Sequence, residues 1–257
     1  MNKKKYSIQD LIKIMNDLRT KCPWDKKQTL KSLKNLTIEE TYELIEALER
    51  ENYDEIKEEL GDLLLHIVFY SKIASEKKQF NFNDVVNLLI EKLIYRHPHI
   101  YSDTKVKGED DVKKNWEKLK LQKSDKGLLD GVPKNLPTLI KATRVQEKVA
   151  SVGFDFKDTA ESIKKVFEEY DEFNEALVKK DKSKIEEEFG DILFSLINYS
   201  RHIGIDPNES LKLSTNKFIK RFKKLEKLVG DKKMKIDKMN ESELILLWED
   251  VKKVKTI

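Results

Sequence analysis

The two halves of this chain carry the same acidic motifs at the same spacing. Residues 39–43 read EETYE, and residues 168–172 in the second half read EEYDE. Residues 59–62 read ELGD, and residues 188–191 in the second half read EFGD. Because the distance between the motifs is the same in both halves, the chain is predicted to contain two copies of one structural unit.

The correspondence continues towards the end of each half with looser spacing. A lysine and an arginine four residues apart follow the second acidic motif, and a tryptophan follows each of these pairs. These residues are Lys92, Arg96 and Trp116 in the first half, and Lys217, Arg221 and Trp248 in the second. The order of carboxylates, cations and tryptophan therefore occurs twice.

Apolar residues recur at helical spacing along most of the chain, and no alternating strand pattern interrupts them. Charged residues make up 38% of the chain, with eight Gly and five Pro, which suits long helices with solvated faces. We expect a first helix after Ser7 and a second that begins near Thr37, with Glu40 completing a capping box. Further helices are expected at about 53–77, 83–96, 109–122, 138–151, 158–179, 182–203, 207–229 and 240–254. The predicted fold is all-α, with two tandem helical-bundle repeats.

A change of composition marks the boundary between the halves. The segment 124–138 reads SDKGLLDGVPKNLPT and is rich in Gly and Pro. Such a segment is typical of a linker. We therefore expect one repeat at 1–123, a linker at 124–137 and a second repeat at 138–257.

Charge and composition narrow the classes of function. The 51 basic and 47 acidic residues nearly cancel, so binding to nucleic acid is not expected. Cys22 is the only cysteine, which excludes an intramolecular disulfide and fits a cytoplasmic protein. The longest apolar run, residues 63–70, contains His66 and is too short to cross a membrane, so no membrane association is expected.

The acidic motifs predict a metal site between two helices. Residues three apart share one face of a helix, so Glu169 and Glu172 project together. Several like charges cannot converge without cations or protons between them, and oxygen ligands favour Mg²⁺, with Mn²⁺ as an alternative. The predicted ligands are Glu169, Glu172, Glu188 and Asp191 in the second half, and Glu40, Glu43, Glu59 and Asp62 in the first.

Polar residues continue along the predicted helix at 182–203 as a stripe on an otherwise apolar segment. The stripe consists of Glu188, Asp191, Ser195, Asn198 and His202. Buried polar groups need partners, because each unsatisfied one costs about 1–3 kcal/mol. We expect a metal ion and its waters to supply these partners, whereas His66 and His202 are interpreted as satisfied structural histidines.

The cations and tryptophans suit a nucleotide. A lysine and an arginine one helical turn apart can contact a polyphosphate, and a tryptophan can stack on a base with little base preference. Taken alone, each is equally well explained without a ligand. Cations four apart are common on protein surfaces, and a tryptophan is more often an anchor of the core.

At the level of whole motifs, the sequence resembles the MazG nucleoside triphosphate pyrophosphohydrolases in their two-domain form. The resemblance rests on EExxE followed by ExxD, and it extends to flanking strings throughout the chain. These strings are CPWD at 22–25, GDLL at 61–64, RHPH at 96–99, VGFD at 152–155 and KFIKRF at 217–222.

The resemblance implies a helical bundle in which two chains or two repeats pair, and a homodimer is expected. It implies hydrolysis of nucleoside triphosphates to the monophosphate and pyrophosphate with broad base tolerance, as in housecleaning of the nucleotide pool. It also implies Mg²⁺ ligation by the four carboxylates of the second half, nucleotide contact by Lys217, Arg221 and Trp248, and catalysis in the C-terminal repeat.

The activity of the first half stays open at this point, because all four of its predicted ligands are intact. The matching stripe of that half is shorter, because Glu59, Asp62 and His66 are followed by Phe69. This difference and the IYRHPH context around Arg96 favour the second half as the catalytic one. By the same correspondence, Lys92, Arg96 and Trp116 are the candidate nucleotide contacts of the first half.

The mechanistic hypothesis is in-line attack of water on the α-phosphorus, with pyrophosphate as the leaving group. Glu168 or Glu169 would orient or deprotonate the water, and Lys217 and Arg221 would neutralise charge that develops on the phosphates. The candidate catalytic residues are Glu168, Glu169, Glu172, Glu188 and Asp191.

Two other classes of protein compete with this reading. A di-iron carboxylate bundle uses Glu-x-x-His pairs, but none of the four histidines has a glutamate three residues before it. A helical scaffold or a nucleic-acid binder would show salt-dependent binding without metal dependence and without phosphate products.

Overall fold

The structure is a computed structural model that describes residues 5–109, 111–112, 115–116, 119, 127–232 and 234–253. Helices form throughout this part of the chain, and no strand occurs in it, which confirms the predicted all-α class. The chain divides into two compact units, residues 1–116 and 117–257, and each is described by itself. The predicted linker at 124–137 remains a prediction.

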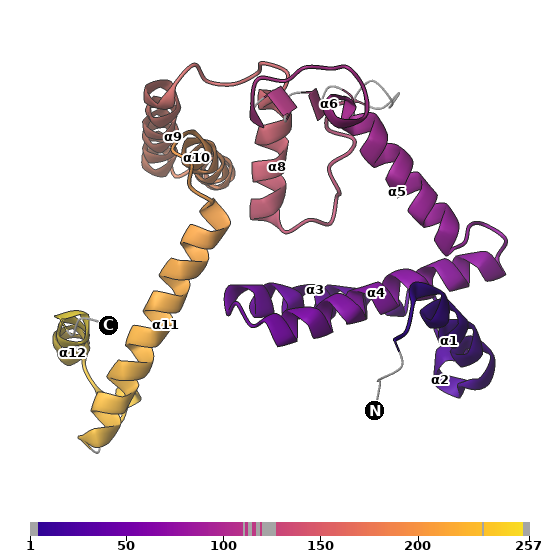
Figure 1. The fold of residues 1–257 in the computed structure, drawn as a ribbon. Helices are drawn as coiled ribbons and strands as arrows, with labels where there is room; N and C mark the ends of the chain where they lie inside the picture. Colours follow the sequence, from indigo (N-terminus) through magenta and orange to yellow (C-terminus); the bar gives the residue numbers. More distant parts are fainter. Residues whose placement is uncertain are drawn as a thin grey trace. The chain divides into compact units, whose positions relative to one another are not determined.

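The first unit is built on an antiparallel pair of long helices, α3 (Leu33–Glu49) and α4 (Tyr53–Glu76), which lie side by side in Figure 1. Helix α1 (Ile8–Lys21) packs against α4, the short α2 (Pro23–Lys27) follows α1, and α5 (Phe82–Arg96) and α6 (Pro98–Tyr101) follow α4. Their core consists of Met15, Leu33, Val68, Phe69 and Ile73.

The second unit repeats this hairpin as α9 (Thr159–Lys179) and α10 (Lys182–His202), which pack against each other (Figure 1). Helix α8 (Thr138–Ala150) packs on α10, and the long α11 (Pro207–Asp231) follows it. A 3₁₀ turn (Ile236–Lys238) leads into α12 (Glu241–Lys253), and α12 packs on α11 through Leu225, Val229 and Val251.

The turns of the two hairpins follow the same repeat as the acidic motifs. Glu51 and Lys180 both adopt the left-handed conformation, with φ of 52° and 54°. The next residues, Asn52 and Asp181, both cap the following helix by accepting hydrogen bonds from backbone N–H groups. The register that aligns the acidic motifs of the two halves therefore also aligns the turns that join their helices.

One predicted boundary is wrong. Helix α3 begins at Leu33 rather than near Thr37, and Thr37 lies inside it, donating to the carbonyl of Leu33 at 3.0 Å. The chain enters this helix through Thr29 and Ser32, whose side-chain oxygens each accept from the other's backbone N–H. These reciprocal bonds stabilise a turn before the helix, and the backbone N–H of Leu33 donates to the carbonyl of Thr29 at 3.2 Å.

The remaining predicted helices agree with the structure to within a few residues, as far as the chain is described. The predicted helix at 109–122 falls largely outside the described residues. Within the described chain, every helix is too short or too polar to span a bilayer.

Candidate functional site

The α9–α10 hairpin brings three of the predicted ligands together. Glu169 and Glu172 lie one turn apart on α9, and Glu188 lies on α10. One carboxylate oxygen from each of the three lies within 4.8 Å of the others. Glu169 and Glu188 are buried, with relative exposures of 7% and 9%, so their charges sit between the two helices.

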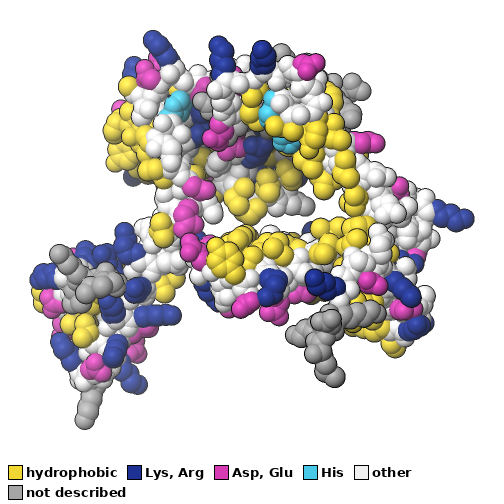
Figure 2. All heavy atoms as spheres, in the orientation of Figure 1, with side chains coloured by type: hydrophobic (Ala, Val, Ile, Leu, Met, Phe, Trp, Pro, Cys, Tyr) yellow, Lys and Arg dark blue, Asp and Glu magenta, His cyan; other side chains and the backbone are white. Residues whose placement is uncertain are grey.

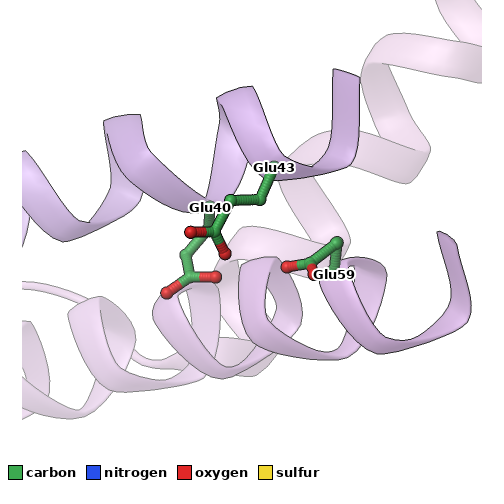
Figure 3. Close-up of side chains that lie close together, drawn as sticks. All are labelled: Glu40, Glu43 and Glu59. Carbon is green, nitrogen blue, oxygen red and sulfur yellow. The ribbon is translucent and has the colours of Figure 1, made fainter. Parts of the chain in front are cut away.

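The α3–α4 hairpin holds the matching set. Glu40 and Glu43 reach from α3 towards Glu59 on α4, and the three carboxylates point towards one another (Figure 3). Their oxygens also lie within 4.8 Å of one another. Two helices with the same sequence spacing and the same turn thus produce two carboxylate triads.

The fourth predicted ligand of each half lies outside its triad. Asp62 is close enough that its negative charge raises the pKa values of both Glu40 and Glu59. Asp191, one turn beyond Glu188, is exposed to solvent. The structure therefore brings together three carboxylates where the sequence suggested four.

Burial and mutual repulsion raise the pKa values of Glu40 and Glu59 in the N-terminal triad. For Glu40, burial is the largest cause, followed by the charges of Asp62 and Glu43. For Glu59, burial is again the largest cause, followed by the charges of Glu43 and Glu40. Both shifts disfavour the ionised form, and a cation among the carboxylates would reverse them.

The C-terminal triad differs because lysines contact it. Burial and the charges of Glu169 and Glu188 raise the pKa of Glu172, and the charge of Lys165 acts in the opposite direction. Lys165 Nζ lies 2.8 Å from Glu169, and Lys184 Nζ lies 3.7 Å from Glu188.

The donor set fits a hard divalent cation. Each triad offers only carboxylate oxygens, drawn from two helices and within 4.8 Å of one another. Oxygen-only sites of this kind suit Mg²⁺ or Mn²⁺ and are poor sites for softer metals. The residues that could hold such an ion are therefore the triads themselves, with Asp62 and Asp191 one turn away.

The polar stripe on α10 has partners other than a metal. Ser195 donates to the carbonyl of Ile192 in its own helix. His202 Nε2 lies 3.1 Å from a carboxylate oxygen of Asp155, which also pairs with Arg201. Contrary to the expectation, Ser195 and His202 therefore have protein partners and need no metal or metal-bound water.

His66 and His202, the two histidines interpreted from the sequence as structural, differ in their hydrogen bonding. His202 is satisfied by Asp155, as expected. His66 is 6% exposed and its Nδ1 has no hydrogen-bond partner, so it is buried but not satisfied. Burial lowers its pKa, and the charge of Asp62 partly opposes this shift.

The cations and the tryptophan of the second half lie on α11 and α12. Lys217 is exposed, and Arg221 is half-buried one turn further along α11. The ring of Trp248 lies 5.2 Å from that of Phe218 and packs against the Leu225 cluster. The indole therefore helps to join α11 to α12, and its contact with a base stays a prediction.

In the first half, the predicted nucleotide contacts bind one another. The guanidinium of Arg96 lies 5.1 Å from the centre of the Trp116 ring, a cation–π contact. The ring of His97 meets the same indole edge-on at 5.0 Å. Lys92 is exposed one turn earlier on α5. Within the described residues, none of these groups contacts a carboxylate of the triads.

A family model described as the MazG nucleotide pyrophosphohydrolase domain matches this chain twice, over residues 28–101 and 153–225. The chain belongs to the MazG family. In this MazG protein each match contains one complete carboxylate triad, together with the hairpin turn that aligns its two helices.

Relatives of this MazG protein align over nearly its whole length. A protein of Escherichia coli named nucleoside triphosphate pyrophosphohydrolase is 37% identical, covering 96% of this chain and 97% of the relative. A Thermotoga maritima protein named nucleoside triphosphate pyrophosphohydrolase/pyrophosphatase MazG is 42% identical, covering 95% of each chain. A crystal structure of a MazG-related protein from Thermotoga maritima covers 44% of this chain and 98% of its own at 23% identity, with a TM-score of 0.40, too low to support an argument.

Several polar contacts in the second unit were not anticipated from the sequence. Lys165 and Lys184 each lie four residues before a buried glutamate, a spacing that places an ammonium beside a carboxylate on one helix face. That signal was present in the sequence. The pairing of Asp155 with Arg201 was not, because it joins residues 46 apart.

Proposed function

We propose that this MazG protein hydrolyses nucleoside triphosphates to nucleoside monophosphates and pyrophosphate, with Mg²⁺ as cofactor and broad tolerance of the base. The observation that carries the proposal is the convergence of three carboxylates from two helices within 4.8 Å, two of them buried. Bringing these negative charges together costs free energy unless a cation compensates them. A Mg²⁺ ion that carries a triphosphate would supply the compensating charge.

In the C-terminal site, Glu169, Glu172 and Glu188 would hold Mg²⁺, with Asp191 one turn away as a further ligand. When bound, the ion would neutralise the triphosphate and polarise the α-phosphate. Glu168 lies beside Glu169 at the surface of α9, with 51% of its side chain exposed. It would orient or deprotonate a water that attacks the α-phosphorus, and Lys217 and Arg221 would neutralise charge on the departing pyrophosphate.

The C-terminal site is proposed as the catalytic one. Its Glu169 and Glu188 each have a lysine within 4.0 Å, whereas no ion pair involves the N-terminal triad within the described chain. These two contacts would hold the carboxylates of Glu169 and Glu188 in place before the ion binds. The N-terminal triad is proposed as a weaker or silent copy.

A homodimer is proposed from apolar side chains that repeat in both hairpins. Leu60, Leu64 and Ile67 are exposed along α4 by 53%, 36% and 46%. The matching positions of the repeat on α10 are Phe189, Leu193 and Leu196, exposed by 53%, 49% and 44%. Figure 2 shows apolar side chains uncovered on the face in view. Stripes of this kind favour burial against a second copy of this chain.

The test resolves products as well as rate. Wild-type protein is incubated with ATP or dGTP in H₂¹⁸O, with Mg²⁺ or with EDTA, and the products are followed by ³¹P NMR. We expect pyrophosphate and monophosphate, with ¹⁸O only in the monophosphate, and no turnover in EDTA. Inorganic phosphate as the first product, or turnover without metal, would contradict the proposal.

Two substitutions test whether the activity depends on the carboxylates of the C-terminal half. Glu172→Ala and Asp191→Ala should each lower turnover by about a hundredfold or more, because even partners behind metal ligands cost about 10–100-fold. Asp171→Asn, an exposed neighbour on the same helix, is the matched control and should keep wild-type turnover. Undiminished turnover in Glu172→Ala would end the assignment to this half.

A further inference from the structure

The two carboxylate triads differ in the cations around them. Lys165 Nζ lies 2.7 Å from Glu168 and 2.8 Å from Glu169, so one ammonium bridges both carboxylates. Residue 36 is the matching position of the first half, and it is a leucine in the core. The first half therefore has no group at this position that could form the bridge.

The bridge joins two residues with different proposed tasks. Glu169 is buried in the triad, and Glu168 is the exposed carboxylate beside it. Lys165 contacts one oxygen of each, which leaves the second oxygen of each carboxylate available. An ammonium that contacts both carboxylates fixes the direction of both side chains.

Burial makes the contact with Glu169 the firmer of the two. The Lys165 side chain is 34% exposed and that of Glu169 is 10% exposed, whereas that of Glu168 is 51% exposed. A partly buried ion pair is screened less by salt than an exposed one. Lys165 is therefore held mainly through Glu169, and it holds Glu168 in turn.

We propose that Lys165 is a positioning residue for hydrolysis in the C-terminal site, because it holds the ligand Glu169 and the water-orienting Glu168 in one fixed arrangement. The proposal rests on the proposed function of that site. The two halves have equivalent carboxylates, and the role of Lys165 would explain why their turnover differs. Leu36, at the matching position of the first half, cannot form the ion pairs that Lys165 forms in the second.

The experiment compares Lys165→Met, Lys165→Arg and the exposed neighbour Lys164→Met. Steady-state kinetics with dGTP at saturating Mg²⁺ give kcat and KM, and electron paramagnetic resonance of Mn²⁺ gives metal affinity without turnover. Lys165→Met should lower kcat about tenfold or more while KM stays within about threefold, as for other residues that orient a ligand. Lys165→Arg should recover most of kcat, and Lys164→Met should match wild type.

The Mn²⁺ titration separates positioning from loss of the site. Lys165→Met should bind Mn²⁺ at least as tightly as wild type, because a positive charge beside the triad has been removed. An unchanged kcat, a loss of kcat that follows weaker Mn²⁺ binding, or failure of arginine to restore kcat would each overturn the proposal. Absence of pyrophosphate release from the wild-type protein would instead overturn the proposed function.

Discussion

Glu169 and Glu188 are buried acidic residues whose neighbours determine what they can do. A carboxylate removed from water needs a compensating charge or hydrogen bonds. In the second half this charge comes from Lys165 and Lys184. In the first half, Glu40 and Glu59 lack such a cation among the described residues, and their pKa values are raised. The same motif thus occupies two electrostatic settings.

His66 gives a prediction about stability and pH. Burial lowers the pKa of its imidazole, so the folded protein binds this proton less readily than the unfolded chain does. Below pH about 6.5 the unfolded chain takes up the proton first, and the free energy of unfolding falls as the pH decreases. The contribution of one such group changes by at most about 1.4 kcal/mol per pH unit.

The variants His66→Leu and His66→Gln remove this titration. Thermal unfolding followed between pH 7.5 and 5.5 should show that both variants lose less stability in acid than the wild type does. Leucine should also relieve the unpartnered Nδ1 atom, so its variant should be no less stable than the glutamine variant at pH 7.5. Identical pH dependence in all three proteins would refute the assignment.

The structural element that the two halves share is the helical hairpin. Each hairpin consists of two long helices joined by a left-handed residue and a capping Asn or Asp. Each brings three carboxylates within 4.8 Å of one another. The residues at positive φ, Glu51 and Lys180, are not glycines. A side chain in this conformation costs about 1–2 kcal/mol, so both turns carry a strain that the adjoining helices impose.

The strain at Lys180 can be measured. Lys180→Gly should raise the free energy of unfolding by up to about 1 kcal/mol, because glycine adopts this conformation without a steric cost. The control is Lys179→Gly, one residue earlier in the last turn of α9, which should lower it by up to about 1 kcal/mol. Denaturant unfolding of both variants checks the sign, and the same sign for both would rule out a left-handed turn at Lys180.

Sequence periodicity predicted these elements well because it records which face of a helix is apolar. The equal offset of the motifs then indicated which carboxylates would meet. It did not indicate that Asp191 would lie outside the triad, since side chains one turn apart on a helix can diverge at their ends. It also could not pair Asp155 with His202, a contact set by the path of the loop before α9.

At the scale of the whole molecule, this MazG protein is two similar hairpin units on one chain. Both units leave apolar stripes uncovered on α4 and α10. A stable monomer rarely exposes such repeated stripes, whereas a symmetric dimer buries the same patch on both subunits.

Light scattering coupled to gel filtration tests the proposed dimer. Wild type should elute at twice the chain mass of 30.3 kDa. Leu193→Glu should weaken the dimer by about tenfold or more in Kd, because a buried unpaired charge costs several kcal/mol. Glu186→Gln, an exposed change on the same helix, serves as the control. A wild-type monomer at micromolar concentration would exclude the dimer.

We propose above all that carboxylates from two neighbouring helices form a site for a divalent cation. Titration of metal-free protein with Mn²⁺, read by electron paramagnetic resonance, tests it without any assumption about substrate. We predict saturable binding that Mg²⁺ displaces, with affinity lowered about tenfold or more by Glu172→Gln but unchanged by Asp171→Asn. Equal Mn²⁺ binding by wild type and by a protein carrying both Glu172→Gln and Glu43→Gln would contradict the account.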